Sequence, residues 1–182
     1  MKKAFLLGVT LLATFSLTGC DMIEKLLQGG QDVVDEKKQY KYDDFAVLIA
    51  GTEFKFDYTK CTAEEEVDEV KTTREYTFNS EDNKWHYETT NGDDRTKDLN
   101  ISSCLQELNA SCKVLKKSID NVFKFYASKK GYEITGTYKS DGNQVDAQYT
   151  FNTAGLITYS EQTNTDLDTV KAVNQKVTYK YE

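Results

Sequence analysis

Alternation of apolar and polar residues is the dominant pattern in the last third of the chain. Tyr132, Ile134 and Tyr138 alternate with polar residues, and the same pattern recurs after Asp141-Gly142. Period-two alternation indicates strands with one dry and one wet face, and Asp-Gly suits the positive φ values of a tight hairpin turn. The pattern therefore predicts an antiparallel meander of four strands. Its segments are 132–139, 144–151, a strand around 157–159, and 173–181.

Shorter alternating segments precede the meander. Segments 52–59, 73–79 and 84–90 carry aromatic residues on one side, and the turn-forming cluster NSEDNK joins the last two. They predict one strand followed by a hairpin. The acidic run 64–69 is predicted to be a solvated loop or a short helix rather than a cation site, and 40–49 fits either a strand or a short helix.

One segment shows the periodicity of a helix. Ser103 and Gln106 can form a capping box at its start, and Gly131 suits its termination after Lys129 and Lys130. The spacing predicts a single amphipathic helix of about six turns. The residues of its apolar stripe are Leu105, Leu108, Cys112, Leu115, Ile119, Val122 and Tyr126.

The helix and the sheet each have one apolar face to bury. The economical solution packs them against each other, which predicts an α+β fold with a curved antiparallel sheet of about six to eight strands around one long helix. In a domain of this size an amphipathic stripe is typical of a core-facing helix rather than of a coiled-coil seam.

The N-terminal segment follows a different pattern. Lys2 and Lys3 precede an apolar run, 4–15, that is too short to span a bilayer, and the run ends in Leu17-Thr18-Gly19-Cys20. This cassette resembles the lipobox of bacterial lipoproteins. The resemblance implies that residues 1–19 are a cleaved signal peptide, and that Cys20 receives a diacylglyceryl group and anchors the protein to the cell membrane on its extracytoplasmic side.

The alternative for this segment is an N-terminal helix that buries its apolar run, with Cys20 as a packing residue. A globular helix of that kind is expected to carry polar residues on one face, and this run has almost none. We therefore expect a lipidated tether over 20–39 and a single α+β domain over 40–182.

Charge restricts the partners of the predicted mature chain. The formal net charge is −7, and removal of Lys2 and Lys3 with the signal peptide brings it to −9. Nucleic acids and anionic lipid surfaces carry the same sign, so electrostatic binding to either is not expected. The predicted membrane contact is therefore the lipid at Cys20, and the sequence identifies no protein partner.

The order of the predicted elements, together with the lipobox, resembles half-barrel lipoprotein carriers and related lipid-binding lipoproteins, although cystatin-like folds give the same coarse order. The resemblance implies a ligand, apolar or lipid, held between sheet and helix. The alternative is a surface-displayed structural or interaction module in which the same aromatic residues fill the core. The candidate pocket-lining residues are Phe54, Phe56, Tyr76, Trp85, Tyr149 and Tyr159.

Catalytic and metal signals are weak. The single histidine, His86, is expected on the wet face of its strand, no nucleophile motif accompanies it, and the cysteines form no C-x-x-C motif. We expect a non-enzymatic protein with no metal and no cofactor.

The cysteines after Cys20 allow one disulfide. Cys104 and Cys112 on one helix would lie about 12 Å apart, beyond the roughly 7 Å limit for bridged Cα atoms. The preferred bridge joins Cys61 to Cys104 or Cys112, and three reduced thiols are the alternative.

The lipobox interpretation predicts a specific loss of labelling. Cys20→Ala removes the sulfur that accepts the diacylglyceryl group, so incorporation of a radiolabelled fatty acid should fall to background. Cys61→Ala is the matched control and should label like the unaltered protein. Undiminished labelling of Cys20→Ala would contradict the interpretation.

Overall fold

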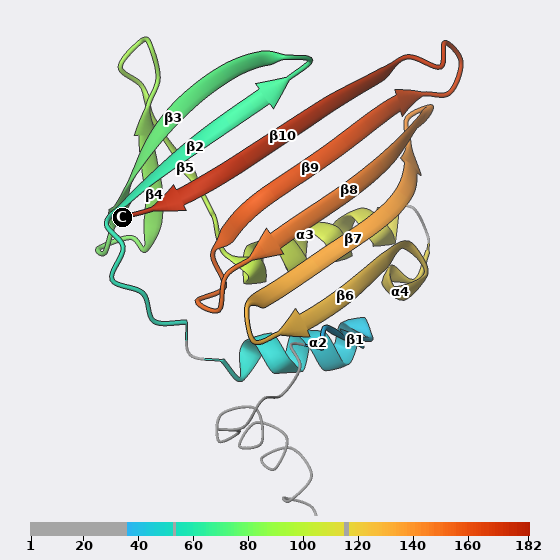
Figure 1. Cartoon of the computed structure of the whole chain (residues 1–182), viewed down its shortest axis with the longest axis horizontal. Helices are drawn as coiled ribbons and strands as arrows, with labels where there is room; N and C mark the ends of the chain where they lie inside the picture. Colours follow the sequence, from blue (N-terminus) through green and yellow to red (C-terminus); the bar gives the residue numbers. More distant parts are fainter. Residues whose placement is uncertain (1–35, 53, 115–116) are drawn as a thin grey trace, which may run out of the picture. The chain divides into compact units, whose positions relative to one another are not determined.

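An antiparallel sheet of ten strands forms most of the part of the chain that the computed structural model describes, which is residues 36–52, 54–114 and 117–182 (Figure 1). The strand order is β1-β6-β7-β8-β9-β10-β2-β3-β4-β5, and the sheet is open, with β1 and β5 at its ends. The strands are β1 (Lys38–Tyr40), β2 (Lys60–Val67), β3 (Val70–Asn79), β4 (Lys84–Glu88), β5 (Asp94–Lys97), β6 (Phe123–Ser128), β7 (Gly131–Ser140), β8 (Asn143–Phe151), β9 (Ile157–Asp166) and β10 (Ala172–Tyr181). The described helices are α2 (Tyr42–Ala50), α3 (Ile101–Val114) and α4 (Ile119–Val122).

The predicted meander is confirmed as β7 to β10. Each strand pairs with the next in antiparallel register, and Asp141 and Gly142 form the turn between β7 and β8 with φ values of 49° and 81°. Two consecutive positive φ values are typical of the type I′ turn that Asp-Gly favours. Local alternation and turn chemistry were therefore sufficient to predict this part of the sheet.

The prediction of one long helix is wrong beyond α3. The described helix α3 ends at Val114, α4 has only four residues, and β6 follows directly and pairs with β1 and β7. Phe123 and Phe125 are buried while Lys124 is exposed, which is the alternation of a strand. The apolar residues Val122 and Tyr126 match a helical spacing by coincidence, because Tyr126 lies on the opposite face of β6 from Phe125.

Two predictions in the first half also need correction. Residues 54–59 form no strand, because Phe54 and Phe56 instead pack onto the core from an irregular segment. The acidic run belongs largely to β2, where Cys61, Ala63 and Glu65 face inward. With β5 and β6 added, the sheet has more strands than predicted.

The other elements of the first half follow the sequence more closely. The hairpin of β3 and β4 is confirmed, and the segment that fitted either a strand or a helix contains the helix α2. The fold class is therefore α+β, with several short helices in place of one long helix.

The helices cover one face of the sheet at its β6–β8 end (Figure 1). Phe45 of α2 lies against Phe125 of β6, with ring centroids 5.3 Å apart, and both rings are fully buried. Ile101, Leu105 and other apolar residues of α3 complete this first core cluster. A second cluster surrounds the buried Trp85 and includes residues of β2, β3 and β10.

The predicted signal peptide, Cys20 and nearly all of the predicted tether lie outside the described residues. Among the helices that are described, none is long and apolar enough to cross a membrane.

The first cluster predicts where the fold is most sensitive to truncation. Phe125→Ala removes a fully buried ring that contacts Phe45 and Tyr42, and large-to-small changes of this kind cost about 3–5 kcal/mol of unfolding free energy. Val47→Ala, at a side chain that is 73% exposed on α2, should change the unfolding free energy by less than about 0.5 kcal/mol. Equal losses of unfolding free energy for the two variants in urea titrations would contradict the importance of the first cluster for stability.

Candidate functional site

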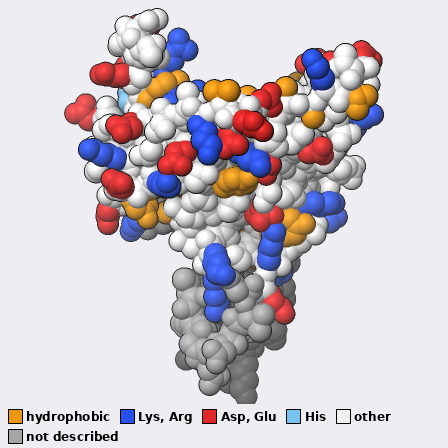
Figure 2. All heavy atoms as spheres, turned by 45° about the horizontal axis from the view of Figure 1, so that its top comes forward, with side chains coloured by type: hydrophobic (Ala, Val, Ile, Leu, Met, Phe, Trp, Pro, Cys, Tyr) orange, Lys and Arg blue, Asp and Glu red, His pale blue; other side chains and the backbone are white. Residues whose placement is uncertain are grey.

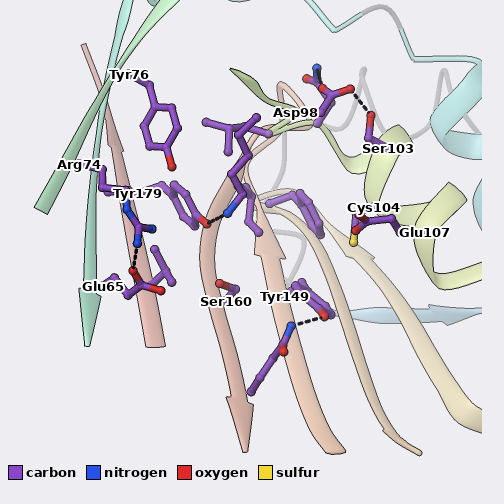
Figure 3. Close-up of a pocket in the computed structure, with 18 of the residues that line it drawn as sticks. Glu65, Arg74, Tyr76, Asp98, Ser103, Cys104, Glu107, Tyr149, Ser160 and Tyr179 are labelled. Atoms are coloured by element: carbon purple, nitrogen blue, oxygen red, sulfur yellow. Dashed lines mark hydrogen bonds and ion pairs between the residues drawn. The ribbon is translucent and has the colours of Figure 1, made fainter. Parts of the chain in front are cut away.

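A cleft of about 590 Å³ lies between the sheet and the segment 98–107, which includes the start of α3 (Figure 3). It opens on the face of the sheet that the helices cover, which we call the inner face. Strands β2, β3, β8, β9 and β10 form its floor, and β5 with residues 98–107 forms its wall. The lining comprises Ala63, Glu65, Arg74, Tyr76, Thr96, Lys97, Asp98, Leu99, Asn100, Ser103, Cys104, Gln106, Glu107, Tyr149, Phe151, Ile157, Ser160, Gln162, Gln175, Val177 and Tyr179.

The floor combines strands that are distant in sequence. Val177 of β10 lies opposite Ser160 of β9 on one side and opposite Glu65 of β2 on the other. Because directly opposed residues of an antiparallel pair share one face of the sheet, the three side chains point to the same side. The pairing of β10 with β2 therefore brings the two halves of the chain together in the cleft.

A bulge determines which residues of β9 reach the cleft. The register between β8 and β9 shifts at Thr150/Phe151, so that Ile157 pairs with Phe151 while Ser160 pairs with Tyr149. An extra residue on one strand reverses the alternation that follows it. Ser160 and Gln162 consequently line the cleft, and Tyr159 lies on the other face, where its hydroxyl donates to Glu161 at 2.7 Å.

A buried carboxylate is held in the floor by two partners. The Glu65 side chain is 9% exposed, its Oε2 lies 2.6 Å from Nη2 of Arg74, and its Oε1 accepts a hydrogen bond from the Gln175 amide. Because a buried charge is costly without such partners, the pair and the amide fix one another's geometry. The Arg74 side chain remains 42% exposed and lines the cleft, so it can contact a molecule bound there.

Further hydrogen bonds orient two tyrosines. Gln162 Nε2 donates to the Tyr149 hydroxyl at 2.8 Å, and Lys97 Nζ donates to the Tyr179 hydroxyl at 3.2 Å. Burial raises the pKa of Tyr149 above its ordinary value, and the neighbouring Cys104 adds to the shift. The Tyr149 phenol therefore remains neutral at physiological pH and acts as a hydrogen-bonding group rather than as a base.

The wall at the start of α3 is polar. Ser103 Oγ donates to Asp98 Oδ2 at 2.6 Å, Cys104 follows it in the first turn of α3, and Glu107 lies on the next turn (Figure 3). Burial, with a smaller contribution from the Glu107 carboxylate, raises the pKa of the Cys104 thiol to about 12. Since the thiolate is the nucleophilic form of cysteine, Cys104 is not activated for attack.

Two of the six predicted pocket residues line the cleft, and the other four do not. Tyr76 and Tyr149 line the cleft. Trp85 is fully buried, and Phe56 is stacked on it with ring centroids 6.1 Å apart. The remaining two lie elsewhere: Phe54 packs against the first cluster, and Tyr159 is on the opposite face of the sheet.

The residues that the sequence analysis missed are the polar ones. Glu65 lies within a run of acidic residues that otherwise suggests a solvated segment, and its partner Arg74 becomes apparent only from the register of β2 against β3. Gln162 and Gln175 are on the inner face because the bulge and the strand pairing place them there. Period-two spacing of Glu65 with Cys61 and Ala63 was the one available signal.

The predicted disulfide is not formed in this structure. Cys61, Cys104 and Cys112 are free thiols, with Cys61 in the second cluster and the other two in contact with the first. Burial raises the pKa of Cys61 to about 11, which keeps this thiol protonated.

His86 lies on β4 outside the cleft and is held between two carboxylates. Its Nδ1 is 2.7 Å from Asp94 Oδ2, and its Nε2 is 2.6 Å from Asp82 Oδ2. Only the imidazolium can donate from both nitrogens, and the hydrogen bonds to Asp94 and then Asp82 raise the pKa of His86. In the described part of the chain, no three His, Cys, Asp or Glu side chains are grouped so that they could hold a metal ion.

Comparisons of the chain with protein-family models, with curated proteins and with solved structures find no match. The chemistry of the cleft must therefore support any functional conclusion by itself.

The buried ion pair predicts an asymmetric response to mutation. Arg74→Met leaves the Glu65 charge with one partner fewer in a buried setting, which costs about 1–3 kcal/mol of unfolding free energy. Adding Glu65→Leu should recover most of that loss, because no unpaired charge then remains. Arg95→Met, at an exposed arginine of β5, is the matched control, and an identical loss there in chemical denaturation would contradict the assignment.

Proposed function

We propose that this chain is a membrane-anchored, extracytoplasmic lipoprotein that binds a small amphipathic ligand in the cleft between its sheet and α3. The observation that carries the proposal is the cleft itself. Its volume of about 590 Å³ lies within the roughly 300–1,000 Å³ typical of small-molecule sites. Such sites combine an apolar surface with a few fixed polar groups, and this lining does the same.

The apolar part of the lining offers flat and branched surfaces. The rings of Tyr76, Tyr149 and Tyr179 lie around the cleft, and Leu99 and Val177 are buried beneath it (Figure 3). Aromatic rings of this kind provide a large contact area at a small cost in conformational entropy. They support binding of a ligand with a planar or compact apolar part.

The polar part of the lining is already organised. Arg74 is oriented by Glu65, the Tyr149 hydroxyl by Gln162, and the Lys97 amine by Tyr179. Because these groups are held before a ligand arrives, less entropy is lost when it binds. The proposed ligand therefore also carries hydrogen-bonding groups.

A long acyl chain is a poorer fit than a compact ligand. The space between the helices and β6–β8 is filled by the buried rings of Phe45, Phe123 and Phe125. Within the cleft, an acyl chain would take water away from Arg74 and Glu107 without replacing the hydrogen bonds, which is unfavourable. We therefore narrow the expected apolar or lipid ligand to a compact amphipathic one.

We assign the cleft no catalytic step. Cys104 is held as a thiol, and Glu65 is committed to Arg74 and Gln175. The proposal needs only binding, with no cofactor and no metal.

The membrane anchor in this proposal rests on the cassette Leu17-Thr18-Gly19-Cys20. The surface of the described domain is consistent with membrane attachment through a lipid rather than through charged side chains. Figure 2 shows acidic and basic side chains interspersed over one face, with hydrophobic side chains only in small groups. A face of this kind has neither the basic patch nor the large apolar patch of a membrane-binding surface.

A matched pair of substitutions on β9 tests the binding proposal. Ser160→Trp places an indole in the cleft, whereas Tyr159→Trp places the same side chain on the opposite face of the strand. In fluorescence titrations of the full chain with anilinonaphthalene sulfonate, an aromatic anion, Ser160→Trp should weaken binding at least tenfold. Tyr159→Trp should bind like the unaltered protein.

Native mass spectrometry of the same proteins, purified from membranes, provides a second measurement. The unaltered protein and Tyr159→Trp should carry a co-purifying small molecule, and Ser160→Trp should lack it. A protein that carries no ligand and takes up no probe would overturn the proposal and favour the interaction module with a filled core.

A further inference from the structure

Most of one edge of β3 has no neighbouring strand among the described residues. On one side β3 pairs with β2 from Val70 to Thr77, but on the other it pairs with β4 only through Thr77 to Asn79. Figure 1 shows the β4–β5 hairpin diverging from the rest of β3. The segment Val70–Tyr76 is therefore an extended strand with one open edge, and all its residues before Tyr76 are exposed.

The turn before β3 determines which backbone groups face this edge. Asp68 and Glu69 have φ values of 46° and 72°, so Val67 and Val70 close a two-residue type I′ hairpin as a hydrogen-bonded pair. Even-numbered residues of β3 consequently bond to the β2 side, as Phe78 does when its N–H donates to the Thr59 carbonyl at 2.9 Å. The N–H and C=O groups of Lys71, Thr73 and Glu75 point to the open edge.

The open edge faces a groove rather than a packed wall. Residues 72–75 of β3 line one side, and His86 with residues 87–90 lines the other, around a space of about 800 Å³. A strand placed against residues 71–75 can therefore reach the backbone of β3.

We propose that a second copy of this chain pairs with this edge, antiparallel and across a two-fold axis at Thr73. In that register Lys71 lies opposite Glu75 of the second copy, Thr73 lies opposite Thr73, and Glu75 lies opposite Lys71. The three pairs use only outward-facing backbone groups and form about six hydrogen bonds. Opposite charges and Thr-Thr pairs are both favourable cross-strand combinations.

Charge complementarity selects this register and this occupant. With the axis at position 71, Lys71 would face Lys71, and with the axis at 75, Glu75 would face Glu75. Like charges directly opposite each other are destabilising. Charged residues on an edge strand normally prevent pairing with unrelated strands. A second copy of the chain can still pair, because the order Lys71, Thr73, Glu75 places opposite charges against each other.

A register-specific cross-link tests the pairing. A hydrogen-bonded pair places the two Thr73 Cα atoms about 5.5 Å apart, within the range of a disulfide, so Thr73→Cys should give a covalent dimer after mild oxidation of membranes that hold the full chain. Glu75→Cys is the matched control, because the two positions 75 would lie about 14 Å apart. The unaltered protein controls for the native cysteines on the same non-reducing gel.

Charge exchange provides an independent test. Lys71→Glu and Glu75→Lys should each weaken dimerisation of the detergent-solubilised full chain roughly tenfold in sedimentation experiments, and the double exchange should restore it. Restoration separates the pairing from simple damage to the fold, because Lys71 also lies 3.5 Å from Glu66 within one copy. A monomer at every concentration, equal cross-linking at 73 and 75, or failure of the double exchange would overturn the proposal.

Discussion

The pairing of β10 with β2 is the interaction on which the rest of the architecture depends. Residues Gln175–Tyr181 lie against Cys61–Val67, and among the described residues no other strand pair connects the meander to the first-half hairpins. Within the described residues, this one ladder makes a single sheet from two sets of local hairpins. The pairing is between distant segments, so forming it closes a long loop at a cost in chain entropy.

The same pairing creates the cleft and its chemistry. Glu65 and Arg74 come from the first half of the chain, while Tyr149, Ser160 and Gln162 come from the meander. The helices fill the inner face at the β6–β8 end with apolar side chains, and they leave the inner face around β10 less covered. A site with both polar and aromatic groups therefore lies where the two halves of the sheet meet.

The parts of the fold that could be predicted from the sequence are those determined by neighbours along the chain. The turn at Asp141-Gly142 and the hairpin of β3 and β4 follow from alternation and turn residues. The strand β6 could not be predicted this way, because Val122 and Tyr126 continue the helical stripe of the preceding segment, and only the pairing of β6 with β7 shows that a strand forms here. Tyr159 was misassigned for a similar reason, since a bulge has no signal in a period-two pattern.

The polar residues of the candidate site could not be predicted from alternation and turn residues alone. Glu65 is buried because Arg74 and Gln175 lie beside it in the register of three strands. The period-two spacing of Glu65 with Cys61 and Ala63 indicates which side of a strand it would occupy, but it does not identify the partners of the carboxylate. A crystal structure of the full chain with anilinonaphthalene sulfonate bound would show directly whether the cleft is the binding site. We predict the probe between Tyr76, Tyr149 and Ser160, with its sulfonate near Arg74; a probe seated elsewhere, with the cleft occupied only by water, would contradict this.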